Sequence, residues 1–118
     1  VNEQTADLYE PGHPAILRLI QNTILAAHKA NIKVGLCGEM ASEPAFTLIL
    51  LGLGLDEFSM SPLNILQIKK LIRSVSLKDA EQLTEEVLKL SRGQEVEELS
   101  RLRLKKLAPH VIETDQKE

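Results

Sequence analysis

The stretch Ile32–Met40, with the sequence IKVGLCGEM, decides the fold that we expect of this chain. Its first six residues are short, apolar and β-branched in part, and they directly follow a segment with helical spacing. This pattern is typical of a buried parallel strand in an α/β fold. The strand would end at Cys37, the only cysteine of the chain, and Gly38 follows it at once.

Helical and extended segments alternate on both sides of this strand. The sequence predicts a helix from Pro14 to Asn31, a loop with the sequence GEMASEP, and a second helix that starts at Ser42 and Pro44 and ends at Gly52. A second strand is predicted over 57–59, and Ser61 caps a third helix that starts at Pro62. Such alternation indicates parallel strands covered by helices. Because two strands do not close a sheet, we expect the last part of a larger α/β fold.

The pattern changes near Ser76, where two amphipathic helices follow each other with a tight turn between them. The first begins with a capping signal at Ser76 and stops at Gly93. The sequence therefore predicts three parts: strand–helix units over 1–75, a helical hairpin over 76–108 and a flexible tail over 109–118.

Composition restricts the partners that we expect. The chain has 118 residues, a net charge of −3 and 43% hydrophobic residues, which fits one globular domain. A negative chain is a poor ligand for nucleic acid, and no apolar run reaches the roughly 20 residues that span a membrane. A single cysteine suits a reducing compartment, so we expect a cytoplasmic protein that binds neither nucleic acid nor membrane. The chain begins with Val1 rather than Met, as expected of a piece of a longer protein.

Cys37 is the candidate functional residue. One interpretation is structural, because free cysteines are usually buried and pack as small hydrophobes. Its position favours function, because ligands of α/β folds bind at the carboxyl ends of parallel strands. Gly38 would let the backbone come close to a ligand, and Glu39 would either orient the thiol or face solvent. The sequence SMS at 59–61 ends the second strand and is expected to face the same site, unless Ser61 only caps a helix.

Metal and phosphate motifs are not found around these residues. His13, His28 and His110 lack metal-ligand spacing to another His, Cys or carboxylate pair, so each is expected to cap a helix or to be solvated. The stretch GLGLDE lacks the Lys and Ser or Thr of a phosphate-binding loop. We therefore assign no metal ligand in this chain.

Three stretches together closely resemble a known family: EPGHPAILRLI at 10–20, VGLCGEMA at 34–41 and LLGLGLDEFSMSP at 50–62. The family is that of the phosphoenolpyruvate-protein phosphotransferases, known as enzyme I of the bacterial phosphotransferase system. The resemblance runs from Val1 to about Arg73 and more loosely through the helical hairpin. One departure is Ser42 with Glu43, where the family usually has Gly-Asp.

The resemblance implies a (β/α)8 TIM barrel that binds phosphoenolpyruvate with magnesium, of which this chain would supply the last two strands with their helices. Phosphate would pass to an enzyme histidine and then to the phosphocarrier protein HPr or its nitrogen-related paralogue. Cys37 would donate a proton to the enolate of pyruvate, with backbone contacts at Gly38 and Glu39. A thiol, with a reference pKa of about 8.5, holds such a proton at neutral pH.

The remaining groups of the family would lie upstream of Val1. These are the phosphate-binding arginines, the magnesium-binding carboxylates and the phosphorylated histidine, so the chain alone is expected to be inactive. The family also implies a homodimer. Two alternatives stay open: a stand-alone helical interaction module with a structural cysteine, and the end of a pyruvate phosphate dikinase or phosphoenolpyruvate synthase.

Overall fold

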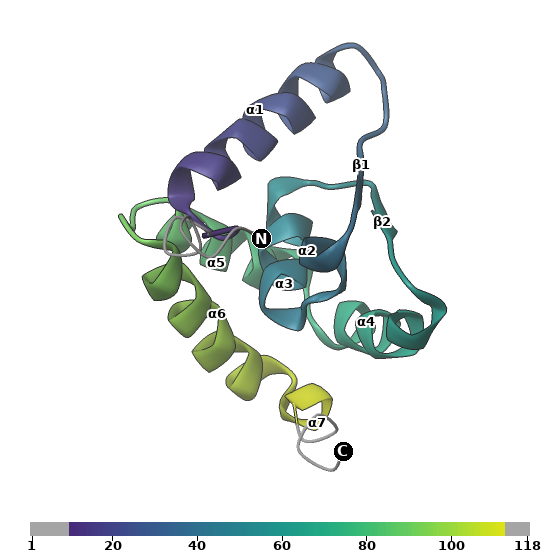
Figure 1. The fold of residues 1–118 in the computed structure, drawn as a ribbon, viewed down its shortest axis with the longest axis vertical. Helices are drawn as coiled ribbons and strands as arrows, with labels where there is room; N and C mark the ends of the chain where they lie inside the picture. Colours follow the sequence, from purple (N-terminus) through teal and green to yellow (C-terminus); the bar gives the residue numbers. More distant parts are fainter. Residues whose placement is uncertain (1–9, 113–118) are drawn as a thin grey trace, which may run out of the picture.

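The computed structural model describes residues 10–112, which form a two-stranded parallel sheet and seven helices (Figure 1). The elements follow one another as α1 (Pro14–Lys29), β1 (Gly35–Cys37), α2 (Glu39–Ser42), α3 (Pro44–Leu53), β2 (Glu57–Ser59), α4 (Pro62–Ser74), α5 (Leu77–Val87), α6 (Gly93–Leu107) and α7 (Pro109–Ile112). The described chain is therefore mixed but mostly helical. The predicted alternation of helices and parallel strands is confirmed in this part, whereas a barrel is not visible in these two strands.

Helix α1 begins and ends as the sequence predicts. His13 is the residue that caps it, because its Nδ1 atom accepts a hydrogen bond of 3.0 Å from the Ala15 N–H, and Pro14 follows in the first turn. The helix ends next to Asn31, whose φ of 58° is the left-handed backbone that asparagine tolerates. Leu17 and Ile24 are buried on the inner side of the helix.

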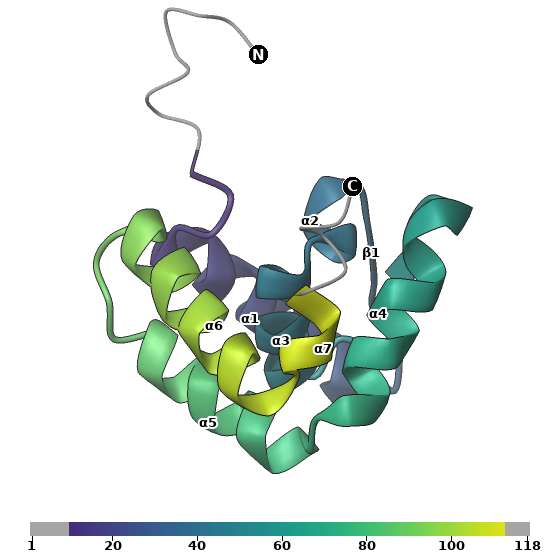
Figure 2. The same ribbon diagram turned by 90° about the horizontal axis from the view of Figure 1, so that it is seen from below.

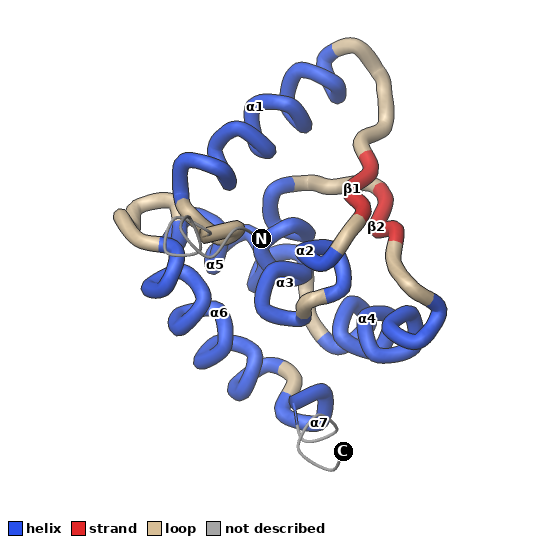
Figure 3. The backbone as a smooth tube through the Cα atoms, viewed as in Figure 1, coloured by secondary structure: helices blue, strands red, loops and turns tan. Residues whose placement is uncertain are grey.

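The strands β1 and β2 lie side by side (Figure 3), and they pair parallel and in register. Leu36 lies opposite Phe58, and both pack against the hydrophobic core. The prediction of a buried strand over 32–37 is wrong: the strand begins at Gly35, and Cys37 is exposed. The physical reason is that helices cover only one face of the sheet, and within residues 10–112 no third strand pairs with either outer edge.

Helix α3 is the centre of the core. It packs against α1, α4, α5 and α6, and most of its side chains are buried. Its predicted end at Gly52 is wrong, because the helix continues to Leu53 and ends at Gly54, which has a φ of 92°. Gly52 serves close packing: a Cβ atom there would lie 2.1 Å from the Thr84 Oγ1 atom and 2.3 Å from the Ala80 carbonyl oxygen.

The hairpin of α5 and α6 differs from the prediction at one end. The capping signal at Ser76 is confirmed, since its hydroxyl oxygen accepts a 3.1 Å hydrogen bond from the Asp79 N–H. Helix α5 ends at Val87 rather than at Gly93, which is the first residue of α6. Gly93 packs closely against the segment before α1: a Cβ atom there would lie 3.1 Å from the Glu10 Cβ, and the Gly93 N–H donates to Glu10 Oε2 at 3.3 Å.

Two short helices occupy segments that the sequence predicts as loop or tail. Helix α2 lies within the GEMASEP stretch, where the fully buried Ala41 anchors the turn. Residues 109–112 differ from the expected flexible tail, because they form α7, with Val111 buried, between α6 and α4 (Figure 2). The rest of that tail, 113–118, lies outside the described residues. No helix within 10–112 is long and apolar enough to cross a membrane.

Candidate functional site

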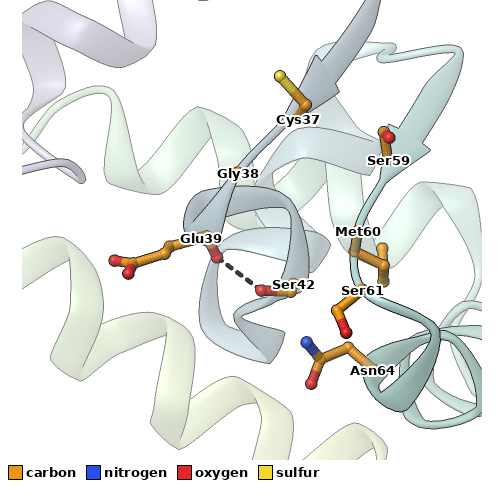
Figure 4. Close-up of a pocket in the computed structure, with 8 residues that line it drawn as sticks. All are labelled: Cys37, Gly38, Glu39, Ser42, Ser59, Met60, Ser61 and Asn64. Carbon is orange, nitrogen blue, oxygen red and sulfur yellow. Dashed lines mark hydrogen bonds between the residues drawn. The ribbon is translucent and has the colours of Figure 1, made fainter.

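Cys37 lies at the carboxyl end of β1, where its side chain is exposed. The register of the sheet places it directly opposite Ser59, the last residue of β2. Figure 4 shows both residues at the ends of their strands, with the Cys37 sulfur pointing away from α2. The two strand ends therefore meet at one edge, as the sequence predicts for parallel strands.

An open hollow of about 430 Å³ lies at this edge. Its lining comes from both strands, from α2 and from the start of α4: Cys37, Gly38, Glu39, Ser42, Ser59, Met60, Ser61 and Asn64. The candidate residues of the sequence analysis therefore share one hollow. Its side chains are mainly thiol, hydroxyl and amide groups, which suit a small polar ligand.

Gly38 turns the chain from β1 into α2. Its φ of 93° and ψ of −168° lie where side chains are rarely found, whereas nothing lies within 4 Å of the Cβ that it lacks. The backbone conformation, and not lack of space, thus requires a glycine. A contact between this backbone and a ligand stays a prediction.

Glu39 does not approach the thiol. Its carboxylate points away from Cys37 and Ser59 (Figure 4), and its carbonyl oxygen accepts a 3.0 Å hydrogen bond from the Ser42 hydroxyl. Glu39 also borders a second hollow of about 750 Å³, whose lining includes the carboxylates of Glu43 and Glu97. This geometry favours the solvent-facing interpretation of the Glu39 side chain.

Ser61 occupies the N-cap position of α4, but its side chain makes no capping hydrogen bond. The interpretation that its hydroxyl only caps the helix is therefore wrong, because the residue lines the hollow instead. Ser42 and Asn64, which were not predicted as site residues, line the same hollow. The sequence gives only a weak indication of their role, because each residue merely lies a few positions after the end of a strand.

The opposite end of the sheet is fixed by Asp56. Its Oδ2 atom accepts a hydrogen bond of 2.9 Å from the Val34 N–H and lies 2.8 Å from the Nε2 atom of His28. The Val34 hydrogen bond, and secondly the one with His28, lower the pKa of Asp56 below its usual value. Asp56 thus joins the start of β2 to the backbone before β1 and to the end of α1. These contacts lie at the end of β2 that is remote from the hollow, so we interpret them as structural.

A metal site is not formed by the part of the chain that the structure describes. Within residues 10–112 no group of three or more His, Cys, Asp or Glu side chains could hold a metal ion. Of the residues that line the hollow, Glu39 is the only carboxylate, and its side chain points away from the thiol.

The hollow lies at the carboxyl ends of the two parallel strands, which is where α/β folds generally bind small ligands. A family model described as PEP-utilising enzyme, PEP-binding domain, matches residues 1–77, and the chain belongs to this family. Both strands and the whole hollow lie within the matched residues. The alternative of a stand-alone helical module is therefore not supported.

Relatives with assigned names cover most of the chain. It is 50% identical over 96 residues to the phosphoenolpyruvate-protein phosphotransferase of Bacillus subtilis, and 45% identical over 98 residues to that of Haemophilus influenzae. The protein of the same name from Listeria monocytogenes is 46% identical over 99 residues. These alignments cover 81%, 83% and 84% of the chain, respectively, but only 17% of each relative. The resemblance predicted from the three motifs is confirmed.

Proposed function

We propose that this chain forms the last part of the phosphoenolpyruvate-binding domain of a phosphoenolpyruvate-protein phosphotransferase, and that Cys37 protonates the enolate of pyruvate. The observation that carries the proposal is the place of the thiol: exposed, at a strand end, and in a hollow that lies within the family match. The names of the relatives favour this enzyme over a pyruvate phosphate dikinase or a phosphoenolpyruvate synthase.

The one-sided sheet supports a barrel in the complete protein. Leu36 and Phe58 face the helices, whereas Gly35, Cys37, Glu57 and Ser59 are exposed on the other face. Strands of a (β/α)8 barrel have helices outside and side chains of the barrel interior on the inner face. The face with Cys37 would then be the inner one, closed by strands other than the two that the structure shows within residues 10–112.

The chemistry assigned to Cys37 is a single proton transfer. Loss of the phosphoryl group from phosphoenolpyruvate leaves the enolate of pyruvate. The S–H bond of Cys37 breaks, its proton forms the third C–H bond of the methyl group, and the enolate electron pair becomes that bond as the carbonyl forms. A thiolate remains and regains a proton from water. A positioned acid of this kind typically accelerates the transfer by about 10²–10⁴-fold.

The described residues do not fit a magnesium site, so no step above involves the metal. We propose that residues outside this chain bind the magnesium of the complete enzyme. The phosphorylated histidine would also lie outside this chain. It follows that the isolated chain transfers no phosphate to the phosphocarrier protein HPr or its nitrogen-related paralogue. A homodimer and a cytoplasmic location, the latter expected from the single free cysteine, belong to the same proposal.

The test is Cys37→Ser in the complete enzyme, because a hydroxyl keeps the size of the thiol but is a far weaker acid. We expect exchange of the pyruvate methyl protons with solvent to slow by about 10²-fold or more, with a smaller effect on phosphoryl transfer from phosphoenolpyruvate to the enzyme. Ser91→Ala, in the exposed turn after α5, is the matched control. An unchanged exchange rate in Cys37→Ser would remove the thiol from the mechanism.

A further inference from the structure

The helical hairpin of α5 and α6 has no role in the proposed function, and α6 lies wholly beyond residues 1–77, which match the family model. Its first residue, Gly93, nevertheless contacts Glu10 near the start of the described chain. We propose that Glu10 is a positioning residue for Cys37: by capping α6, it ties the hairpin to the segment 10–12 and holds Pro11 as a wall beside the thiol. This inference rests on the proposed function, in which Cys37 gives up its proton.

Helix α6 takes its cap from a distant part of the chain. Its N-cap residue, Arg92, makes no side-chain capping hydrogen bond, and the first N–H groups of a helix have no partner within the helix. Glu10 supplies a partner, because the Gly93 N–H donates to Glu10 Oε2 at 3.3 Å. A carboxylate is also favourable at the positive N-terminal end of a helix. The approach is close, since a Cβ atom at Gly93 would lie 3.2 Å from the same oxygen.

Arg18 makes a second tie between α1 and the hairpin. Its Nη2 atom donates to the Leu88 carbonyl oxygen at 2.7 Å, at the C-cap of α5. A cation is favourable at this negative end of a helix. The start of α1 lies beside the start of α6 (Figure 1, Figure 2), so the turn between α5 and α6 is held at both of its ends from the same part of the chain.

The segment 10–12 leads from this tie to the thiol. Pro11 lines the second hollow together with Cys37 and Phe46. Gly12 is buried against the same aromatic ring, because a Cβ atom there would lie 2.6 Å from the Phe46 Cε1 atom. The segment therefore lies between the start of α6 on one side and the hollow on the other. Loss of the Glu10 contact would free Pro11 to move away from the thiol.

Amide hydrogen exchange in this chain tests the cap without any substrate. We expect Glu10→Ala to speed exchange of the Gly93 amide about three- to tenfold, because a hydrogen bond to a charged group is lost. Glu10→Gln keeps an acceptor oxygen of the same reach and should restore the wild-type rate. Thr84→Val is the matched control, because it weakens the contact of α5 with α3 and leaves Glu10 in place. An unchanged Gly93 rate in Glu10→Ala, or an equal change in Thr84→Val, would overturn the inference.

The complete enzyme tests the positioning role. We expect Glu10→Ala to slow exchange of the pyruvate methyl protons about three- to tenfold, because a small displacement at the reacting groups slows the transfer. The KM for phosphoenolpyruvate should stay the same, because Pro11 has no group that binds the anionic ends of the substrate. Arg18→Ala, which loosens the same turn from its other end, should slow the exchange as well, whereas Glu10→Gln should match the wild type. A raised KM at an unchanged exchange rate would overturn the inference.

Cys37→Ser distinguishes the failure of this inference from that of the proposed function. If Cys37→Ser slowed methyl-proton exchange and Glu10→Ala did not, only the role of Glu10 would be wrong. If Cys37→Ser left the exchange unchanged, the proposed function would fail, and the positioning role of Glu10 would fail with it.

Discussion

Asp56 and His28 join the start of β2 to the end of α1, with 2.8 Å between the Asp56 Oδ2 and His28 Nε2 atoms. The same carboxylate oxygen accepts a hydrogen bond from the Val34 N–H, just before β1. The backbone N–H groups of Asp56 and Glu57 also donate to the Val34 carbonyl oxygen, each at 3.1 Å. These contacts fix the register of the two strands at one end. They thereby hold Cys37 opposite its neighbour at the other end.

Asp56→Asn should remove a contribution to stability that depends on pH. The pKa of Asp56 is lowered in the folded chain, mainly by the Val34 hydrogen bond and secondly by His28. A lowered carboxyl pKa stabilises the fold above the unfolded pKa of about 3.9, and this contribution is lost as the pH falls through the lower folded value. We expect the urea midpoint of the variant to lie below that of the wild type at pH 7. The two should converge in acid.

The control for this experiment is Glu81→Gln on the exposed side of α5. Its urea midpoint should stay close to that of the wild type across the same pH range. A difference between Asp56→Asn and wild type that stayed unchanged as the pH fell from 7 into the acid range would contradict the assignment, because protonation of the carboxylate removes its contribution to stability.

Gly52→Ala should destabilise the chain through the contact of α3 with α5. The added methyl group would lie 2.1 Å from the Thr84 Oγ1 atom and 2.3 Å from the Ala80 carbonyl oxygen. Because one of these atoms is backbone, the helices themselves must move apart, which typically costs about 1–3 kcal/mol. Urea denaturation measures the loss. Gly35→Ala is the control, since its nearest neighbour would be the Glu57 Cβ at an ordinary 3.4 Å; equal losses in both variants would contradict the close contact.

Thr84→Val tests a buried hydrogen bond at the same helix contact. The Thr84 hydroxyl donates to the Ile49 carbonyl oxygen at 3.0 Å, and the threonine is buried. Valine keeps the shape but not the donor, so the free energy of unfolding should fall by about 1 kcal/mol. The matched control is Thr23→Val, whose hydroxyl donates to the Leu19 carbonyl oxygen on an exposed face. If Thr23→Val lowered the free energy of unfolding by as much, the loss would come from the change in helix propensity and not from the burial of the hydrogen bond.

The parallel strands and the meeting of their ends could be predicted because they depend on local patterns. Short apolar runs alternate with segments that have helical spacing, which indicates parallel strands. Parallel strands bring their carboxyl ends to one edge of the sheet. The same logic placed Cys37 beside residues 59–61. It could not place Ser42 and Asn64, because their positions depend on the short helix α2 and on how α4 leaves β2.

Glycines are the clearest case of what the sequence could not decide. Gly52 and Gly93 both follow helical patterns and were predicted as helix ends, yet one lies inside α3 and the other begins α6. Each packs closely against a partner far along the chain, Thr84 for Gly52 and Glu10 for Gly93. Glycine is found both where a helix ends and where a helix packs closely against its neighbour, so the sequence looks the same in the two cases. Only the tertiary neighbour distinguishes them.

The isolated chain should associate with a second copy of itself through α4. Leu63 and Leu66 are 92% and 80% exposed, and their spacing places them on one face of that helix. Apolar side chains so exposed are typical of a contact surface, and the outer strand edges nearby have no partner within residues 10–112. We expect sedimentation equilibrium at micromolar concentration to show a dimer. Leu63→Gln with Leu66→Gln should weaken it at least about tenfold, because burying one leucine contributes roughly 1.5–3 kcal/mol. Leu102→Gln, on the exposed side of α6, should leave the dimer intact. A wild-type chain that stays monomeric under these conditions would show that α4 is not a contact surface.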